Sequence, residues 1–384
     1  MESIIAFNPI KIINKLFLCS ALVILLLITS CSKSTPEVTQ PSPSLTKTKN
    51  FTSADATKAY TDFNTAFYSP NDKLYYSTTE KKDIGSVWTQ AIYWDMAMNA
   101  YERTKDPGYL TLISDIYDGG AKRYDNYNWN NTTPWFIYDD MMWWVIALNH
   151  AYELTGDAKY LNTAKAGFTR VWNGSYDPAN GGMWWDFNHT GKNSCINYPT
   201  VIAAIKLFKN TSDATYLDKA KSIYSWSRNN LFNTGTGRVA DNKIGNNPGY
   251  TDYTYNYGTC IGAAMLLYKQ TNEVSYLNDA KLAANYVKNT MCNTNGILPA
   301  EGDFNEQGVL KAILAQYLVL LNAAAPDAGY ATWVDNNINS AWANRDQTRG
   351  IMYRNYAVLC PTGIVQSYES SSAVAFMQLF PPIP

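Results

Sequence analysis

Two adjacent aspartates, Asp139 and Asp140, are the residues of this sequence best suited to perform chemistry. Two carboxyl groups held close together ionise unequally, because the first loses its proton easily and the second then keeps its proton to higher pH. Such a pair provides one nucleophile or base and one acid, and a separation of about 5–5.5 Å suits a double displacement at an acetal carbon. Acidic residues also cap helix N-termini and complement the helix dipole, which is the structural alternative for this pair.

The surrounding residues predict that the pair lies at the start of a helix. Residues 138–144 read Tyr-Asp-Asp-Met-Met-Trp-Trp, a Pro-Trp pair precedes them, and an apolar helical pattern follows. Proline followed by acidic residues in a first turn is a helix-start signal. We therefore expect both carboxylates beside packed aromatic rings at a helix N-terminus.

Helical periodicity dominates from residue 51 onward and predicts one all-α domain, residues 51–384. Helices opening with Tyr-Leu-x-x-Ala-Lys start at Tyr160, Tyr216 and Tyr276, a repeat of about 50–60 residues that indicates stacked helical hairpins. Short turns alternate with long loops, and the helices after the long loops are apolar nearly all round, so they should be buried. An inner ring of buried helices inside an outer amphipathic ring is an (α/α)6 barrel of six hairpins. The predicted helices cover residues 52–68, 88–104, 108–124, 139–155, 157–173, 197–210, 214–231, 256–271, 274–291, 307–324, 327–343 and 370–380.

The first 50 residues have a different character. Lys11 and Lys15 precede an apolar run, residues 16–28, which ends in Thr-Ser-Cys at Cys31. Residues 1–31 are therefore interpreted as a lipoprotein signal peptide with Cys31 as the acylated mature N-terminus, an ordinary cleaved signal peptide being the alternative. Residues 32–50, rich in Ser, Thr, Pro and Lys, form a flexible tether in this interpretation. The expected location is the bacterial cell envelope, with a lipid anchor in the outer membrane, facing the periplasm or the outside.

Composition excludes several classes of function. The net charge is −1 and charged residues make up only 16% of the chain, so a nucleic-acid partner is not expected. Only two histidines are present, which argues against a histidine-based zinc site or a Ser-His-Asp triad. We expect a monomer that needs no metal and no cofactor. The four cysteines after the signal segment are irregularly spaced and are interpreted as buried thiols, with one bridged pair as the alternative: Cys195, Cys260, Cys292 and Cys360.

The long loops should gather at one mouth of the barrel and form a sugar-binding surface. The chain has 29 Tyr and 12 Trp, and flat rings with a polar edge suit neutral, hydroxyl-rich ligands. The paired glycines Gly181 and Gly182 would let the backbone approach a ligand. A glycine turn with Trp packed against it is the structural alternative for the same motif. Another long loop carries Glu301, Asp303 and Glu306 as further candidates. The expected substrate contacts are Trp88, Tyr138, Trp143, Gly181, Gly182, Trp184, Trp185, Asn197, Tyr255, Asn256 and Tyr257.

Five motifs in order over residues 85–315 resemble glycoside hydrolase family 76, the bacterial endo-α-1,6-mannanases. They read YDDMMWW, NGGMWWDF, KNSCINYP, TYNYGT and GDFNEQGVLKAI. The resemblance implies an (α/α)6 barrel, a retaining mechanism and α-1,6-mannan or manno-oligosaccharide substrates, with Asp139 as nucleophile and Asp140 as acid/base. The chain departs from the family pattern at Tyr257, where Gln is usual, and at residues 310–312, where Phe-Lys-Gly is usual.

Two other functions remain open at this stage. An unsaturated glucuronyl hydrolase or an epimerase on the same barrel would need cationic or histidine groups at the mouth. A non-catalytic envelope lipoprotein that binds glycans would share the aromatic content, but it would have no need for two crowded carboxylates.

Overall fold

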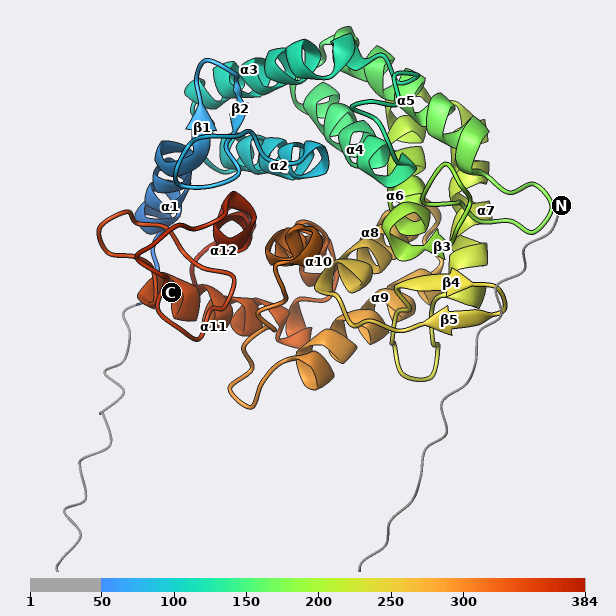
Figure 1. Ribbon diagram of the computed structural model, residues 1–384. Coiled ribbons are helices and arrows are strands. Elements are labelled where there is room, and N and C mark those ends of the chain that lie inside the picture. Colours follow the sequence, from blue (N-terminus) through green and yellow to red (C-terminus); the bar gives the residue numbers. More distant parts are fainter. Residues whose placement is uncertain (1–49, 384) are drawn as a thin grey trace, which may run out of the picture. The chain divides into compact units, whose positions relative to one another are not determined.

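The computed structural model describes residues 50–383, and its helices form two concentric rings (Figure 1). The predicted signal segment, residues 1–31, lies outside the described residues, as do residues 32–49 of the tether and Pro384. The inner ring contains α2 (Val87–Thr104), α4 (Tyr138–Thr155), α6 (Ser194–Thr211), α8 (Thr254–Thr271), α10 (Leu310–Ala324) and α12 (Ser367–Leu379). The outer ring contains α1 (Ser53–Phe67), α3 (Gly108–Arg123), α5 (Ala158–Ser175), α7 (Ala214–Asn230), α9 (Val274–Tyr286) and α11 (Tyr330–Ala343).

Each inner helix packs against the next inner helix, and α12 contacts α2, so the ring closes. The prediction of an (α/α)6 barrel is therefore confirmed. The difference between the rings lies in their burial. Helix α8 buries every residue from Thr254 to Met265, whereas α5 buries one stripe that includes Tyr160, Ala164, Phe168 and Val171. Residues spaced by three or four positions share one face of a helix, so the outer helices bury one side and leave the other to solvent.

Glycine allows α8 and α10 to approach closely. A Cβ atom at Gly258 would lie 2.7 Å from the Cα of Leu314, and one at Gly262 would lie 2.5 Å from the Tyr317 ring. Helix α10 is largely apolar, and most of its residues are buried. The stretch Phe304–Ala324 is long and apolar enough to cross a membrane by composition alone, but 61% of its most apolar window is buried inside the barrel.

One kind of turn joins four inner helices to the outer helices that follow them, and it explains the repeat seen in the sequence. These four inner helices are α2, α4, α6 and α8. Each of them ends at a Thr whose hydroxyl donates to the carbonyl four residues earlier and accepts the backbone N–H two residues later. The residue after the Thr is left-handed, which ends the helix. In the turns after α4 and α6, an aspartate then caps the next helix by accepting the N–H of its second residue. The four threonines are Thr104, Thr155, Thr211 and Thr271.

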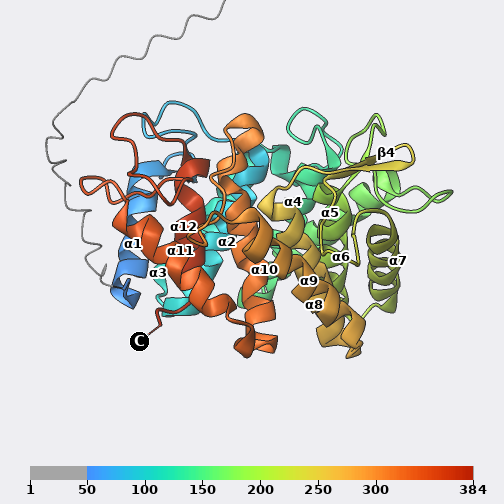
Figure 2. The same ribbon diagram turned by 90° about the horizontal axis from the view of Figure 1, so that it is seen from below.

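The long connections lie at the opposite end of the barrel, where they form short strands (Figure 2). Strands β1 (Tyr68–Ser69) and β2 (Leu74–Tyr75) pair antiparallel, with Tyr68 opposite Tyr75. Strands β3 (Lys192–Asn193), β4 (Asn242–Ile244) and β5 (Asn247–Gly249) form an antiparallel sheet in that order, with Lys192 opposite Lys243. These strands fix the loops that follow α5 and α7 against each other above the inner ring.

Several helix boundaries differ from the prediction. Helix α6 begins at Ser194 instead of residue 197, so Pro199 lies inside the helix and not in its first turn. Helix α9 ends at Tyr286, and the predicted remainder is a short π-helix, Val287–Met291. Helices α10 and α11 start three residues later than predicted, because the 3₁₀ segments Phe304–Val309 and Pro326–Ala328 precede them.

Candidate active site

Asp139 and Asp140 occupy the first turn of α4, as the sequence predicted. The N-cap residue, Ile137, has no side-chain oxygen, and the Asp139 Oδ1 atom instead accepts the backbone N–H of Asp140 at 2.9 Å. The dipole of α4 also favours negative charge at this end. Asp139 is partly exposed and Asp140 is 4% exposed. Both side chains form part of the wall of one cavity.

That cavity has a volume of about 1170 Å³ and opens among the long loops. The N-terminal ends of α2, α4 and α6, the start of α8 and the segment before α10 all contribute side chains to it. Its lining mixes aromatic rings with carboxyl groups, and Arg123 is the one Lys or Arg among the described residues that line it. The acidic residues in the wall are Asp125, Asp139, Asp140, Asp241 and Glu306.

The two catalytic candidates differ in acidity. Burial raises the pKa of Asp139, and hydrogen bonds from the Cys195 thiol and the Asp140 backbone N–H oppose that rise. Burial also raises the pKa of Asp140, and the negative charges of Asp139 and Glu306 raise it further. Asp139 is therefore the first of the two to become a carboxylate, and Asp140 keeps its proton to higher pH.

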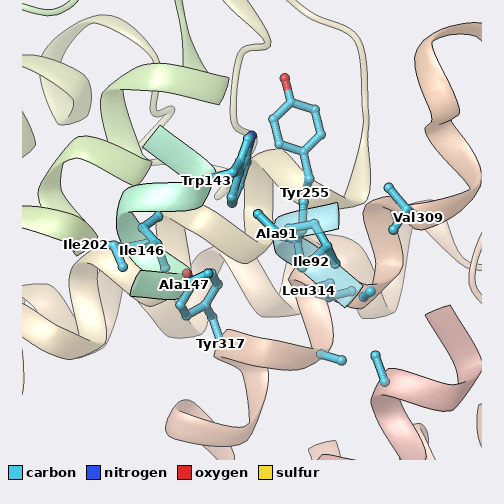
Figure 3. Close-up of a cluster of buried hydrophobic side chains, with 14 of the residues drawn as sticks. Ala91, Ile92, Trp143, Ile146, Ala147, Ile202, Tyr255, Val309, Leu314 and Tyr317 are labelled. Carbon is cyan, nitrogen blue, oxygen red and sulfur yellow. The ribbon is translucent and has the colours of Figure 1, made fainter. Parts of the chain in front are cut away.

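Four of the predicted aromatic contacts form part of the cavity wall: Trp88, Trp143, Trp185 and Tyr255. The ring centroids of Trp88 and Trp143 are 6.4 Å apart, and the Trp88 Nε1 donates to Glu306 Oε2 at 3.0 Å. The Tyr255 hydroxyl donates to Asp241 at 2.9 Å. Figure 3 shows the Trp143 and Tyr255 rings above a buried layer that includes Ile92, Ile146 and Leu314. The inner helices thus form a rigid apolar base for the cavity.

The paired glycines do not lie on the cavity. Gly181 and Gly182 have φ of +69° and +76°, and a Cβ atom on either would meet the Trp226 ring at 2.8 and 2.7 Å. Trp184 stacks on His189, with the Lys192 Nζ 4.5 Å from its ring centroid. The motif is therefore a glycine turn packed against tryptophan, which was the structural alternative, and of this motif only Trp185 reaches the cavity.

Four further predicted contacts also lie outside the cavity lining, because their side chains have structural partners. Tyr138 packs edge-on against Phe187, with ring centroids 4.6 Å apart. Asn197 bonds both the N–H and the carbonyl of Met183. Asn256 donates to the Thr251 carbonyl at 3.1 Å. Tyr257 is fully buried, stacks on Tyr286 and donates to Asp252, so the departure from the family pattern at this position lies behind the wall of the site.

The segment 298–309, which precedes α10, brings Glu306 to the cavity. Glu301, Asn305 and Glu306 have left-handed φ values of 58°, 47° and 55°. Glu301 is held by a buried ion pair with Lys311, 3.4 Å between Nζ and Oε2, and it accepts the backbone N–H of Thr254 at 2.8 Å, at the start of α8. Asp303 instead pairs with Arg354 and does not contribute to the cavity wall. Of the three acidic candidates in this loop, only Glu306 reaches the site.

Sequence reasoning missed several residues of the cavity wall. Tyr124 and Arg123 come from the end of α3, and Phe136 and Phe304 come from two different loops. Phe136 is 53% exposed and Phe304 is 74% exposed. None of these positions has a local sequence pattern that points to a ligand. Cys195 also reaches the cavity, and it is a free thiol, as are Cys260, Cys292 and Cys360. Cys195, Cys260 and Cys360 are buried as predicted, whereas Cys292 is only partly buried.

Comparison with known proteins gives consistent results. The family model described as glycosyl hydrolase family 76 matches residues 52–379. The structure of the α-1,6-mannanase GH76A from Salegentibacter sp. HEL1_6 aligns with a TM-score of 0.78 at 28% identity, covering 85% of this chain and 98% of that one. A variant of that enzyme, inactive through substitution of two adjacent aspartates and bound to α-1,6-mannotetraose, aligns with a TM-score of 0.76 at 27% identity and the same coverage.

A curated relative is the putative mannan endo-1,6-alpha-mannosidase C970.02 of Schizosaccharomyces pombe, 26% identical over 223 residues. The alignment covers 53% of this chain and 50% of the relative, so the chain spans about half of the relative's length.

Proposed function

The chain belongs to glycosyl hydrolase family 76, and on that premise we propose that it is an endo-acting α-1,6-mannanase that retains anomeric configuration. The observation that carries the proposal is the pair of adjacent acids, Asp139 and Asp140, in the first turn of α4 on the wall of a large cavity. The related enzyme that becomes inactive when two adjacent aspartates are replaced, and that binds α-1,6-mannotetraose, supports both the pair and the substrate.

In this mechanism Asp139 attacks the anomeric carbon and Asp140 donates its proton to the departing glycosidic oxygen. The C–O bond to the leaving sugar breaks as the bond to Asp139 forms. Asp140, now a carboxylate, takes a proton from water, which attacks the same carbon and releases Asp139. The backbone N–H of Asp140 holds the Asp139 carboxylate in place.

Glu306 contributes through its charge. It makes deprotonation of Asp140 less favourable, so that the acid remains protonated while Asp139 is ionised. The hydrogen bond from Trp88 fixes the Glu306 carboxylate without neutralising it.

The composition of the cavity favours a neutral polymer. Among the described residues, the wall has five carboxyl groups and one cationic side chain, and this excess of negative charge would repel an anionic uronate, which argues against a glucuronyl hydrolase. The exposed rings of Phe136 and Phe304 offer apolar faces on which further sugar units can stack. A chain that extends beyond one sugar is what an endo-acting enzyme binds.

Incubation with unbranched α-1,6-mannan tests the proposal. We expect a rapid fall in polymer size, and NMR should show that the first reducing ends released are α-anomers. Asp139→Asn and Asp140→Asn should each lower kcat/KM by about 10³-fold or more. Asp303→Asn is the matched control, because that carboxylate lies in a mouth loop outside the cavity wall.

Azide separates the two roles. On an aryl α-mannoside whose leaving group needs no protonation, azide should restore turnover of Asp140→Ala and yield the α-mannosyl azide, whereas with Asp139→Ala it should yield the β-azide. Full activity of either Asn variant would refute the corresponding role. Binding of mannan without hydrolysis by the wild-type protein would favour the glycan-binding alternative.

We also propose that the protein is a monomer anchored in the bacterial envelope through an acylated Cys31. The apolar run that ends in Thr-Ser-Cys supports this proposal. Cys31→Ser should prevent incorporation of labelled palmitate and release the protein from membranes. Membrane association unaffected by this substitution would contradict the anchor.

A further inference from the structure

Tyr253 directly precedes α8 and forms part of the cavity wall, although it was not among the predicted substrate contacts. Both of its neighbours in the chain are held by other segments. Asp252 pairs with Arg238 at 2.8 Å, and the Thr254 N–H donates to Glu301 at 2.8 Å. The backbone of Tyr253 is therefore fixed on both sides.

The Tyr253 ring is partly exposed and stacks on the Tyr255 ring, with centroids 6.1 Å apart and an angle of 26° between the ring planes. Figure 3 shows that the Tyr255 ring points away from the buried layer, and its hydroxyl donates to Asp241 at 2.9 Å. Because Tyr253 lies on the cavity wall and keeps part of its surface exposed, its side chain is accessible from the cavity.

A chain of two hydrogen bonds determines the direction of the Tyr253 hydroxyl proton. The Gln307 Oε1 accepts the backbone N–H of Gly302 at 3.0 Å, so the Gln307 Nε2 is the amide atom that faces Tyr253. This nitrogen can only donate, and the Tyr253 oxygen, 3.0 Å away, therefore accepts the bond. The hydroxyl proton must point elsewhere.

Within the part of the chain that the structure describes, the bond from Gln307 is the one hydrogen bond of the Tyr253 hydroxyl, so its proton has no protein acceptor there. Burial raises the pKa of Tyr253, and the negative charges of Asp241 and Glu301 raise it further, so the hydroxyl keeps its proton at neutral pH. Solvent or a ligand must then accept the hydrogen bond. Such a group is a fixed, uncharged donor on the wall of the cavity.

We propose that the Tyr253 hydroxyl binds substrate by donating a hydrogen bond to an oxygen of a mannosyl unit in the cavity, while Gln307 holds the hydroxyl in that direction. This inference rests on the proposed function, since it names a further contact of the same site. The ligand class is a neutral hexose chain, whose oxygens accept hydrogen bonds from uncharged donors.

The test must separate the bond to substrate from the bond to Gln307, because Tyr253→Phe removes both. It therefore compares Tyr253→Phe in the presence of Gln307 and in the Gln307→Met background, where the internal bond is already absent. All these variants carry Asp139→Asn, and calorimetry measures the binding of α-1,6-mannotetraose. We expect Tyr253→Phe to weaken binding about 3- to 10-fold in both backgrounds.

Stability provides a second readout. Tyr253→Phe should lower the melting temperature slightly when Gln307 is present, because the bond between the two side chains is lost. In the Gln307→Met background it should leave the melting temperature unchanged and still weaken binding. A hydroxyl that served only to hold Gln307 would have no effect on binding in that background, and this result would overturn the proposal.

Tyr250→Phe is the matched control. Tyr250 lies three residues earlier, is 38% exposed and does not line the cavity. Its ring packs against Arg238, with the guanidinium carbon 4.5 Å from the ring centroid. Loss of this hydroxyl should change neither the binding of mannotetraose nor the melting temperature.

The outcomes separate the two proposals. A wild-type protein that hydrolyses mannan, combined with normal mannotetraose binding after Tyr253→Phe, would overturn the role of Tyr253 and leave the proposed function intact. A wild-type protein that neither hydrolyses mannan nor, as Asp139→Asn, binds mannotetraose would overturn both.

Discussion

Replacement of Lys311 by Met should destabilise the barrel and should also disturb the segment 298–309, which brings Glu306 to the cavity. Lys311 is fully buried and Glu301 is nearly so, and the pair joins α10 to the segment 298–309. The Lys311 Nζ also donates to the Ala300 carbonyl at 3.2 Å. Removing one partner of a buried ion pair leaves the other charge without compensation, which costs about 3–5 kcal/mol.

The size of the change in melting temperature follows from the size of the domain. An unfolding entropy of about 2.1 cal/mol/K per residue gives roughly 0.7 kcal/mol/K for a domain of about 330 residues. A loss of about 3–5 kcal/mol then corresponds to a fall in melting temperature of roughly 4–7 °C.

The effect should depend on pH. Burial raises the pKa of Glu301 and lowers that of Lys311, and Lys311 opposes the rise at Glu301. Without Lys311 the folded-state pKa of Glu301 rises further above its unfolded value. A carboxyl group whose pKa is raised in the folded state costs no folding stability below its unfolded-state pKa of about 4.3, and it costs its full free energy above its folded-state pKa. The destabilisation should therefore grow from about pH 4 to neutral pH.

Thermal unfolding of Lys311→Met, Glu301→Gln and the double variant provides the assay. Gln at position 301 keeps an acceptor for the Thr254 N–H, so the double variant should recover most of the loss. The value of kcat/KM should fall in Lys311→Met, because the same loop brings Glu306 to the cavity. This reasoning would be refuted if Lys311→Met were as stable as the wild type at neutral pH, or if the double variant were no more stable than Lys311→Met.

Two further predictions concern the site and its support. Glu306→Gln should shift the basic limb of the pH profile of kcat/KM to lower pH, because the negative charge that raises the pKa of Asp140 is lost. Gln keeps the acceptor for the Trp88 N–H, so the loop should stay in place. An unchanged basic limb would exclude this effect of charge. Gly120→Ala should lower stability by about 1–3 kcal/mol, since its Cβ would lie 2.3 Å from the Tyr127 hydroxyl and 2.9 Å from the Trp144 ring. Gly363→Ala has open space around it and should be neutral, and denaturant unfolding compares the two.

The helices and the barrel were predictable because their signals are local and repeated. Periodicity separates amphipathic from fully buried helices, and the turns at Thr155 and Thr211 both have an Asp two residues after the Thr. Asp139 and Asp140 were predictable for a related reason, since both lie within a single turn whose helix-start signals are adjacent in the chain.

Which loop residues face the cavity was decided only by the tertiary structure. Nothing local distinguishes Trp184, which stacks on His189, from Trp185, which lines the site. Likewise, Tyr124 depends on aromatic partners up to 20 residues away, and Glu306 depends on an ion pair between its loop and α10. The types of residue at the mouth can be read from the chain, but the direction of each side chain follows from packing between distant segments, which determines whether its polar atoms bond to protein or remain available to substrate.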